Sequence, residues 1–86
     1  MPRYFFHTLD GRDIEDNIGT ELAGLVEARL EAVRTAGAIL ADDARAFWRD
    51  GTPWRMRVAD ESGASVFTLV FTSEESAQPV APGGDE

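Results

Sequence analysis

One amphipathic segment near the middle of the chain most constrains how it can fold. Between residues 25 and 49, apolar residues recur at steps of three and four, the period of a helix with one buried face. This apolar stripe consists of Val26, Leu30, Val33, Gly37, Leu40, Ala44 and Phe47. Residues 50–53 read Asp-Gly-Thr-Pro and should end the helix, because Gly accepts a left-handed cap and Pro cannot continue a helix. We therefore expect one long helix that begins after Gly24 and buries this stripe.

A second stripe of mostly small residues lies on another side of the same helix. It consists of Ala28, Ala32, Ile39 and Ala46. Small residues permit the close approach of a partner, but Ala also has the highest intrinsic helix propensity. We favour the propensity interpretation and expect this second stripe to lie outside the core.

Segments with strand character lie on both sides of the helix. Residues 3–9 and a weaker segment around 14–18 are joined by Asp10-Gly11, a strong hairpin turn signal. Residues 54–59 and 66–71 are joined by a short polar turn that contains Gly63. The order β-β-α-β-β predicts an α+β domain, in which one long helix packs on one face of a four-stranded, mostly antiparallel sheet. Numbered along the chain, the strand order 2-1-3-4 would keep all neighbours antiparallel.

The chain of 86 residues is long enough for one domain. We assign this single α+β domain to residues 1–72. The remaining residues, 73–86, read SEESAQPVAPGGDE and are rich in Ser, Pro, Gly and acidic residues. Such a segment cannot bury enough apolar surface to offset its ordering entropy, so we expect a disordered tail.

Three consecutive aromatic residues, Tyr4, Phe5 and Phe6, must place bulk on both faces of the first strand. Tyr4 and Phe6 should face the helix, together with the alternating apolar residues of the last two strands, Trp54, Met56, Phe67, Leu69 and Phe71. Because one helix covers only one face of the sheet, Phe5 should lie on an open outer face. The predicted interaction face consists of Phe5, His7, Leu9, Arg55, Arg57, Val66, Thr68 and Val70.

Composition limits the functions that are open to the chain. It contains no Cys, which excludes disulfides and thiolate chemistry and fits a reducing cytoplasm. A formal net charge of -8 opposes binding to the phosphate backbone, so we expect no nucleic-acid partner. Neither a signal peptide nor a membrane-spanning segment is expected. We therefore expect a soluble cytoplasmic protein without a membrane partner.

The chain has few residues of the types that commonly catalyse reactions or bind metals. His7 is the only His, and a His beside an aromatic residue on a sheet face usually has a packing role, so we expect no enzyme. Four acidic residues crowd the first turn, Asp10, Asp13, Glu15 and Asp16, but their spacing differs from that of a calcium-binding loop. Turn preference and the protection of a sheet edge explain them without an ion. We expect no metal, no cofactor and no identifiable small-molecule substrate.

The chain resembles a family of short bacterial proteins whose domain has no assigned function. The resemblance covers roughly residues 1–72 and rests on the opening MPRYFFH, Asp10-Gly11, Asp16, Gly19-Thr20-Glu21-Leu22, Ala28, Trp54, Val58-Ala59-Asp60-Glu61, Gly63 and Phe67 to Phe71. It implies no catalytic residue, cofactor or partner. An Asp often stands in that family where this chain has Gly24. A looser likeness to antitoxins of the HicB type rests only on the pattern of Leu25, Glu27-Ala28, Ala32 and Ala36.

These observations favour a noncatalytic interaction module that self-associates through the outer sheet face or the edge of the last strand. We expect its partner to be a second copy of the chain, in a homodimer, or else one other protein. The alternative is a small regulatory or antitoxin-like protein that binds a dedicated partner. A remote alternative is an RNA-binding sheet platform, in which Arg55, Arg57 and Phe5 would contact single-stranded RNA.

Overall fold

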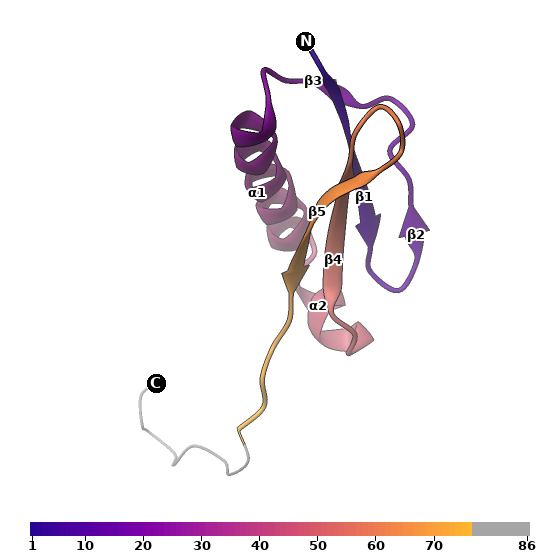
Figure 1. Ribbon diagram of the computed structural model, residues 1–86. Coiled ribbons are helices and arrows are strands. Elements are labelled where there is room, and N and C mark those ends of the chain that lie inside the picture. Colours follow the sequence, from indigo (N-terminus) through magenta and orange to yellow (C-terminus); the bar gives the residue numbers. More distant parts are fainter. Residues whose placement is uncertain (77–86) are drawn as a thin grey trace.

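The computed structural model describes residues 1–76, except for the side chain of Asp50. In chain order the elements are β1 (Arg3–Leu9), β2 (Asp13–Ile14), β3 (Thr20–Glu21), α1 (Leu25–Asp42), α2 (Ala44–Asp50), β4 (Trp54–Ala59) and β5 (Ser65–Phe71). Figure 1 shows two layers, with α1 along one face of the sheet and the short α2 at one end of it. The predicted α+β class and the β-β-α-β-β order are confirmed.

The sheet has the order β2-β1-β4-β5, and β3 pairs with the other end of β1. All of these strand pairs are antiparallel, so the predicted order 2-1-3-4 is confirmed. The predicted second strand around residues 14–18 is wrong in extent. It is replaced by two strands of two residues each, β2 and β3, with a loop between them.

The core lies between the sheet and α1. The sheet contributes five buried side chains, Tyr4, Phe6, Trp54, Met56 and Val58. The alternation that predicted burial of Tyr4, Phe6, Trp54 and Met56 is confirmed. Phe67 and Leu69 are half-buried against this cluster, while Phe71 is 51% exposed.

The helix meets this core with a different face from the one that the sequence predicts. Its buried residues are Ala28, Ala32 and Ala36, and not the larger apolar residues of the expected stripe. Of the five members of that stripe within α1, four lie at the surface, namely Val26, Leu30, Val33 and Gly37. Large aromatic side chains of the sheet already fill the space between the layers, so the helix packs closely only through small residues. Choosing the largest apolar side chains therefore predicts the wrong buried face of α1.

The predicted single helix to residue 49 is also wrong, because the chain leaves helical geometry at Asp43. This residue has φ -138° and ψ 63°, and it ends α1 and precedes α2. The break turns α2 back towards the sheet, where Phe47 packs against the core and meets the ring of Phe71 edge-on at 5.1 Å. As predicted, Gly51 ends the helical region in the left-handed conformation, with φ 72°.

The hairpin between β4 and β5 is closed by the side chain of Asp60. Its carboxylate accepts hydrogen bonds from the backbone N–H of Ser62 at 2.9 Å and of Ala64 at 3.1 Å. The pairing of the two strands then shifts by one residue, so that Val66 has no direct partner in β4. From Phe67 to Phe71 the two strands pair residue for residue. Beyond β5, residues 73–76 are exposed without helix or strand, and the rest of the predicted tail, 77–86, lies outside the described residues.

Candidate interaction surface

One edge of the sheet is completed by the loop between β2 and β3. The carboxylate of Asp16 accepts hydrogen bonds from the backbone N–H of Phe6 at 3.1 Å, of Ile18 at 3.0 Å and of Gly19 at 3.0 Å. Its own N–H donates to Nδ1 of His7 at 3.2 Å. Asp16 therefore gives β1 the hydrogen bond that a neighbouring strand would otherwise supply. We call β1, with β2, β3 and this loop, the closed edge.

These contacts also determine the charge of Asp16. Partial burial raises its pKa, but the hydrogen bonds from Gly19, Ile18 and Phe6, together with the nearby His7, outweigh this and lower the pKa below its ordinary value. The carboxylate is therefore ionised at neutral pH. The acidic residues of the first turn thus include one with a definite structural role, which the spacing alone does not reveal.

The same loop covers part of the predicted outer face. Phe5 and His7 are half-buried and stack with their rings 7° apart in plane and 6.4 Å between centroids. A Cβ added at Gly19 would lie 2.8 Å from the ring of Phe5 and 2.8 Å from Cγ of Arg3. The aromatic residue that the sequence leaves facing outwards is therefore covered, in part, by the chain's own loop.

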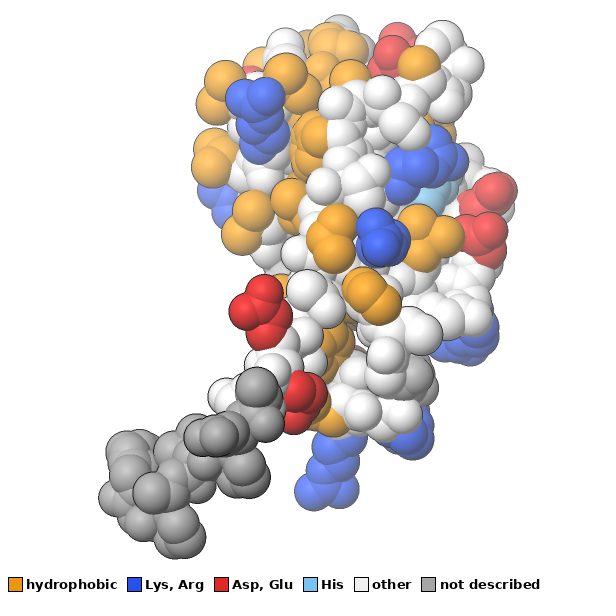
Figure 2. Space-filling model, turned by 60° about the horizontal axis from the view of Figure 1, so that its bottom comes forward, with side chains coloured by type: hydrophobic (Ala, Val, Ile, Leu, Met, Phe, Trp, Pro, Cys, Tyr) orange, Lys and Arg blue, Asp and Glu red, His pale blue; other side chains and the backbone are white. Residues whose placement is uncertain are grey.

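The rest of the predicted face is divided by charge. Strand pairing brings most of the predicted residues together, since His7 lies opposite Arg57 and Leu9 opposite Arg55, with Thr68 and Val70 on the next strand. Val66, the remaining member, lies at the shift in the β4–β5 pairing. Arg57 donates a hydrogen bond to Oγ of Ser65 at 3.0 Å. Arginine side chains between hydrophobic ones are visible over the sheet in Figure 2, so this face is mixed. Binding through it stays a prediction.

A more continuous apolar surface lies on the opposite side of the domain from the closed edge. Within residues 1–76, β5 has a paired strand only on its β4 side. Its sequence, SVFTLVF, contains no charged residue. Figure 2 shows hydrophobic side chains gathered on the α1 side of the molecule. We call the unpaired side of β5 the open edge.

A groove runs between α1 and the open edge. Its volume is about 270 Å³, and eight residues line it: Val33, Ala36, Gly37, Leu40, Trp54, Leu69, Val70 and Phe71. We define the exposed stripe as Val26, Leu30, Val33 and Gly37, and two of its members, Val33 and Gly37, line the helical side of this groove. Exposed apolar surface of this kind, beside an unpaired strand, is typical of a protein interaction site.

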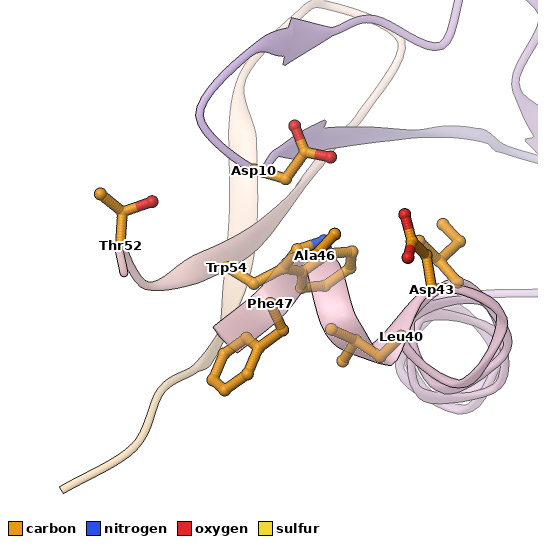
Figure 3. A pocket seen from close by; sticks show the side chains of 8 residues that line it. Asp10, Leu40, Asp43, Ala46, Phe47, Thr52 and Trp54 are labelled. Atoms are coloured by element: carbon orange, nitrogen blue, oxygen red, sulfur yellow. The ribbon is translucent and has the colours of Figure 1, made fainter. Parts of the chain in front are cut away.

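A much smaller hollow lies where α1, α2 and the first turn meet. Asp10 and Asp43 approach it from two different segments, beside Phe47 and Trp54 (Figure 3). Its volume is about 50 Å³, enough for one or two water molecules, and it borders an open, more polar depression of about 550 Å³ that shares Asp10, Asp43, Ala46 and Thr52 with it. Among the residues that the structure describes, no group of three or more His, Cys, Asp or Glu is placed to hold a metal ion.

The fold and these surfaces define a small two-layer α+β domain with one closed and one open sheet edge. The chain belongs to the family described as Domain of unknown function (DUF6894), whose family model matches residues 3–72. The resemblance to a family without assigned function is thereby confirmed. Neither a curated protein nor a solved structure matches the chain. Over the described residues, neither helix has the length and apolar character needed to cross a membrane.

Proposed function

We propose that this domain is a noncatalytic protein–protein interaction module that self-associates. The observation that supports this proposal is the pairing of an uncharged open edge with the exposed stripe of α1, on the same side of the domain. Val26 and Val33 are each 62% exposed and Leu30 is 52% exposed, although all three belong to the strongest apolar stripe of the sequence. A helix in an isolated domain buries such a stripe, whereas a helix at an interface presents it to a partner.

The test is the mass of the full chain in solution. Light scattering after size exclusion should give about twice the monomer mass of 9.4 kDa. Val33→Glu should reduce the mass to that of the monomer, because the charge would have to be desolvated in the interface. Ala38→Glu is the matched control, since Ala38 is exposed on the same helix outside the stripe. It should leave the dimer intact.

The circular dichroism of both variants should equal that of the parent, because both positions are exposed. A parent chain that stays monomeric up to high micromolar concentration contradicts self-association. The groove beside α1 then favours the alternative of a regulatory or antitoxin-like protein with one dedicated partner, because an extended segment of that partner could add to the open edge.

A further inference from the structure

The two edges of the sheet are protected to different degrees. Unpaired strands are templates for further pairing, and proteins usually block them with short strands, charged side chains or covering loops. The closed edge has all three, since β2 and β3 have two residues each, Asp13 and Glu21 lie in them, and the Asp16 loop covers the interval. Over Ser65–Phe71 the open edge has neither a charge nor a Pro. Over these seven residues no other strand of residues 1–76 pairs with the open edge, whereas the other edge is blocked, so the open edge is suited to pairing.

We propose that β5 pairs antiparallel with β5 of a second copy of this chain, around a two-fold axis that passes beside Leu69. This inference rests on the proposed function and specifies its geometry. The axis is perpendicular to the sheet, so the two sheets join into one and both copies of α1 lie on the same face. A two-fold contact needs only one surface, which must be complementary to itself.

The register follows from the regular part of β5. Phe67 to Phe71 pair with β4 without interruption, so this stretch is straight enough to accept a second neighbour. Centred on Leu69, it places Phe67 opposite Phe71 of the second copy, and Thr68 opposite Val70. Apolar or β-branched side chains then meet on both faces of the joined sheet, which stabilises cross-strand pairs.

Charge separates this register from its neighbour. With the axis at Leu69, Glu74 and Glu75 approach the turn residues Ala64 and Gly63 of the second copy, which carry no charge. An axis moved to Thr68 would instead bring Glu75 towards Glu61 in that turn, where like charges repel. The acidic residues after β5 therefore disfavour an axis at Thr68, while the midpoint of the uninterrupted stretch from Phe67 to Phe71 favours Leu69.

The exposed stripe provides the rest of the contact. Across the axis, the groove-lining part of the stripe on each α1, Val33 and Gly37, would face that of the second copy. The most exposed large apolar residues on this side are Val26, Leu30, Val33, Val70 and Phe71, at 51% to 62% exposure. Four of the five are Val or Leu, which are smaller than the aromatic side chains that bury about 150 to 250 Å² each, so at about half exposure the five together present a few hundred Å² of apolar surface. A stable interface buries about 800 Å² per partner, of which about 60% is apolar, so these side chains supply a large part of the apolar area that a dimer requires.

Engineered cysteines test this pairing directly, because the chain has no Cys of its own. Chains with Thr68→Cys are mixed with chains with Val70→Cys, oxidised and separated without reductant. The two positions are exposed and would lie directly opposite each other, about 4.5 to 5.5 Å apart at Cα, within reach of a disulfide. The mixture should form a cross-linked dimer, recognised by different masses of the two chains.

Each variant alone is the register control. Two Thr68→Cys chains would hold their cysteines about 8 Å apart, beyond ordinary disulfide reach, so each single variant should cross-link at least tenfold less than the mixture. Efficient cross-linking of Thr68→Cys alone overturns the Leu69 register. A mixture of Ile18→Cys with Val70→Cys controls for random collision, because Ile18 is 80% exposed on the closed edge.

The mass of the parent chain separates the two proposals. If the parent is a dimer and the mixed cysteine variants do not cross-link, the pairing of β5 is overturned while self-association stands. If the parent is a monomer at all concentrations, both are overturned. Circular dichroism of the reduced variants should equal that of the parent, since both substitutions are at exposed positions.

Discussion

The closed and open edges of the sheet differ in how their backbone groups are satisfied. At the closed edge, Asp16 supplies the hydrogen bond that Phe6 would otherwise need from another strand. At the open edge, β5 is regular from Phe67 to Phe71, and no side chain of Ser65–Phe71 carries a charge. The comparison shows that a small domain can block one side of a sheet with a few polar contacts and leave the other side suited to association.

The largest loss of stability should follow from Trp54→Ala, in the core beside the open edge. Trp54 is 5% exposed, lies in β4 next to β5 and forms part of the floor of the groove. Loss of a large buried aromatic side chain typically costs about 3 to 5 kcal/mol in unfolding free energy, a large share of what a small domain has. Urea denaturation measures this. Trp48→Ala is the control, because Trp48 is 65% exposed, and a similar loss in both variants would contradict a core role for Trp54.

At the closed edge we expect the next largest effect from Gly19→Ala. Gly19 has φ 77°, and an added Cβ would lie within 2.9 Å of three side-chain atoms of Arg3 and Phe5. Left-handed strain of about 1 to 2 kcal/mol and overpacking of similar size should together cost about 2 to 4 kcal/mol.

Gly63→Ala, in the turn that leads into the open edge, separates the two contributions. Gly63 has φ 88° but nothing within 4 Å of the added Cβ, so only the strain of about 1 to 2 kcal/mol should remain. Thermal unfolding of both variants gives the comparison. Equal losses would mean that the loop does not press on Phe5 in solution.

The difference between the edges predicts a difference in association. Val70→Asp places on the open edge the kind of charge that the closed edge already has. It should raise the dissociation constant of the dimer at least 100-fold, because the carboxylate must be desolvated on association. This change corresponds to a loss of about 2.7 kcal/mol in binding free energy. Sedimentation equilibrium measures this constant, and Ile18→Asp on the closed edge should leave it unchanged. An equal effect of both variants would contradict the distinction between the edges.

The Asp16 contact predicts a stability difference that depends on pH. In Asp16→Asn the amide NH₂ would face the part-buried N–H of Phe6, and leaving this donor unsatisfied should cost about 1 to 2 kcal/mol in unfolding free energy. Because the pKa of Asp16 is lowered in the folded state, its stabilisation is complete above the unfolded pKa of about 3.9 and is lost as the pH falls through the lower folded pKa.

Urea midpoints at several pH values test this prediction. The difference in urea midpoint between the parent and Asp16→Asn should be constant from pH 7 to pH 5 and should become smaller below pH 4. Asp60→Asn is the control near the open edge. The pKa of Asp60 is also lowered, chiefly by the hydroxyl of Ser62. Because this carboxylate accepts hydrogen bonds only within its own turn, Asp60→Asn should lower the urea midpoint less than Asp16→Asn does. A gap that widens in acid would contradict the role of the ionised carboxylate.

Strand alternation predicts much of the fold from the sequence. It identifies the buried side chains of β1 and β4, because residues two apart in a strand lie on the same face. The large apolar side chains of Trp54 and Met56 indicate which face of β4 is buried. Strand alternation also predicts which residues meet on the outer face. The break of the helix at Asp43 has no Gly or Pro to indicate it, and it depends on the return of Phe47 to the core.

Two features of the surface could not be read from local patterns. The Asp16 carboxylate reaches Phe6 across ten residues, so only the folded chain shows that this loop completes β1 and covers Phe5. The orientation of α1 depends on the volume between the layers. A sequence pattern ranks Val26 and Val33 above Ala28 and Ala32 by hydrophobicity, but it does not include the space that aromatic side chains of the sheet already occupy.

The smallest effect should come from Gly24, which connects the closed edge to the helix that carries the exposed stripe. Gly24 is the N-cap of α1, has no side chain to accept a hydrogen bond, and its φ of 176° is open to any residue. An added Cβ would meet only Oε1 of Glu27, at 3.8 Å. Gly24→Ser should therefore raise the unfolding free energy by about 0.5 to 1 kcal/mol, through a new capping bond and a less flexible unfolded chain.

Gly24→Asp tests the same cap with a charge. Its carboxylate gains from the helix dipole but lies near that of Glu27, and salt screens both interactions, so the Asp and Ser variants should differ most in low salt and have similar midpoints in high salt. Thermal midpoints in low and high salt measure both effects. The mass in solution should not change in either variant, because Gly24 lies outside the exposed stripe. If Gly24→Ser lowers the midpoint, Gly24 does not have the extended conformation of an N-cap in solution, and the chain enters α1 from the closed edge by a different path.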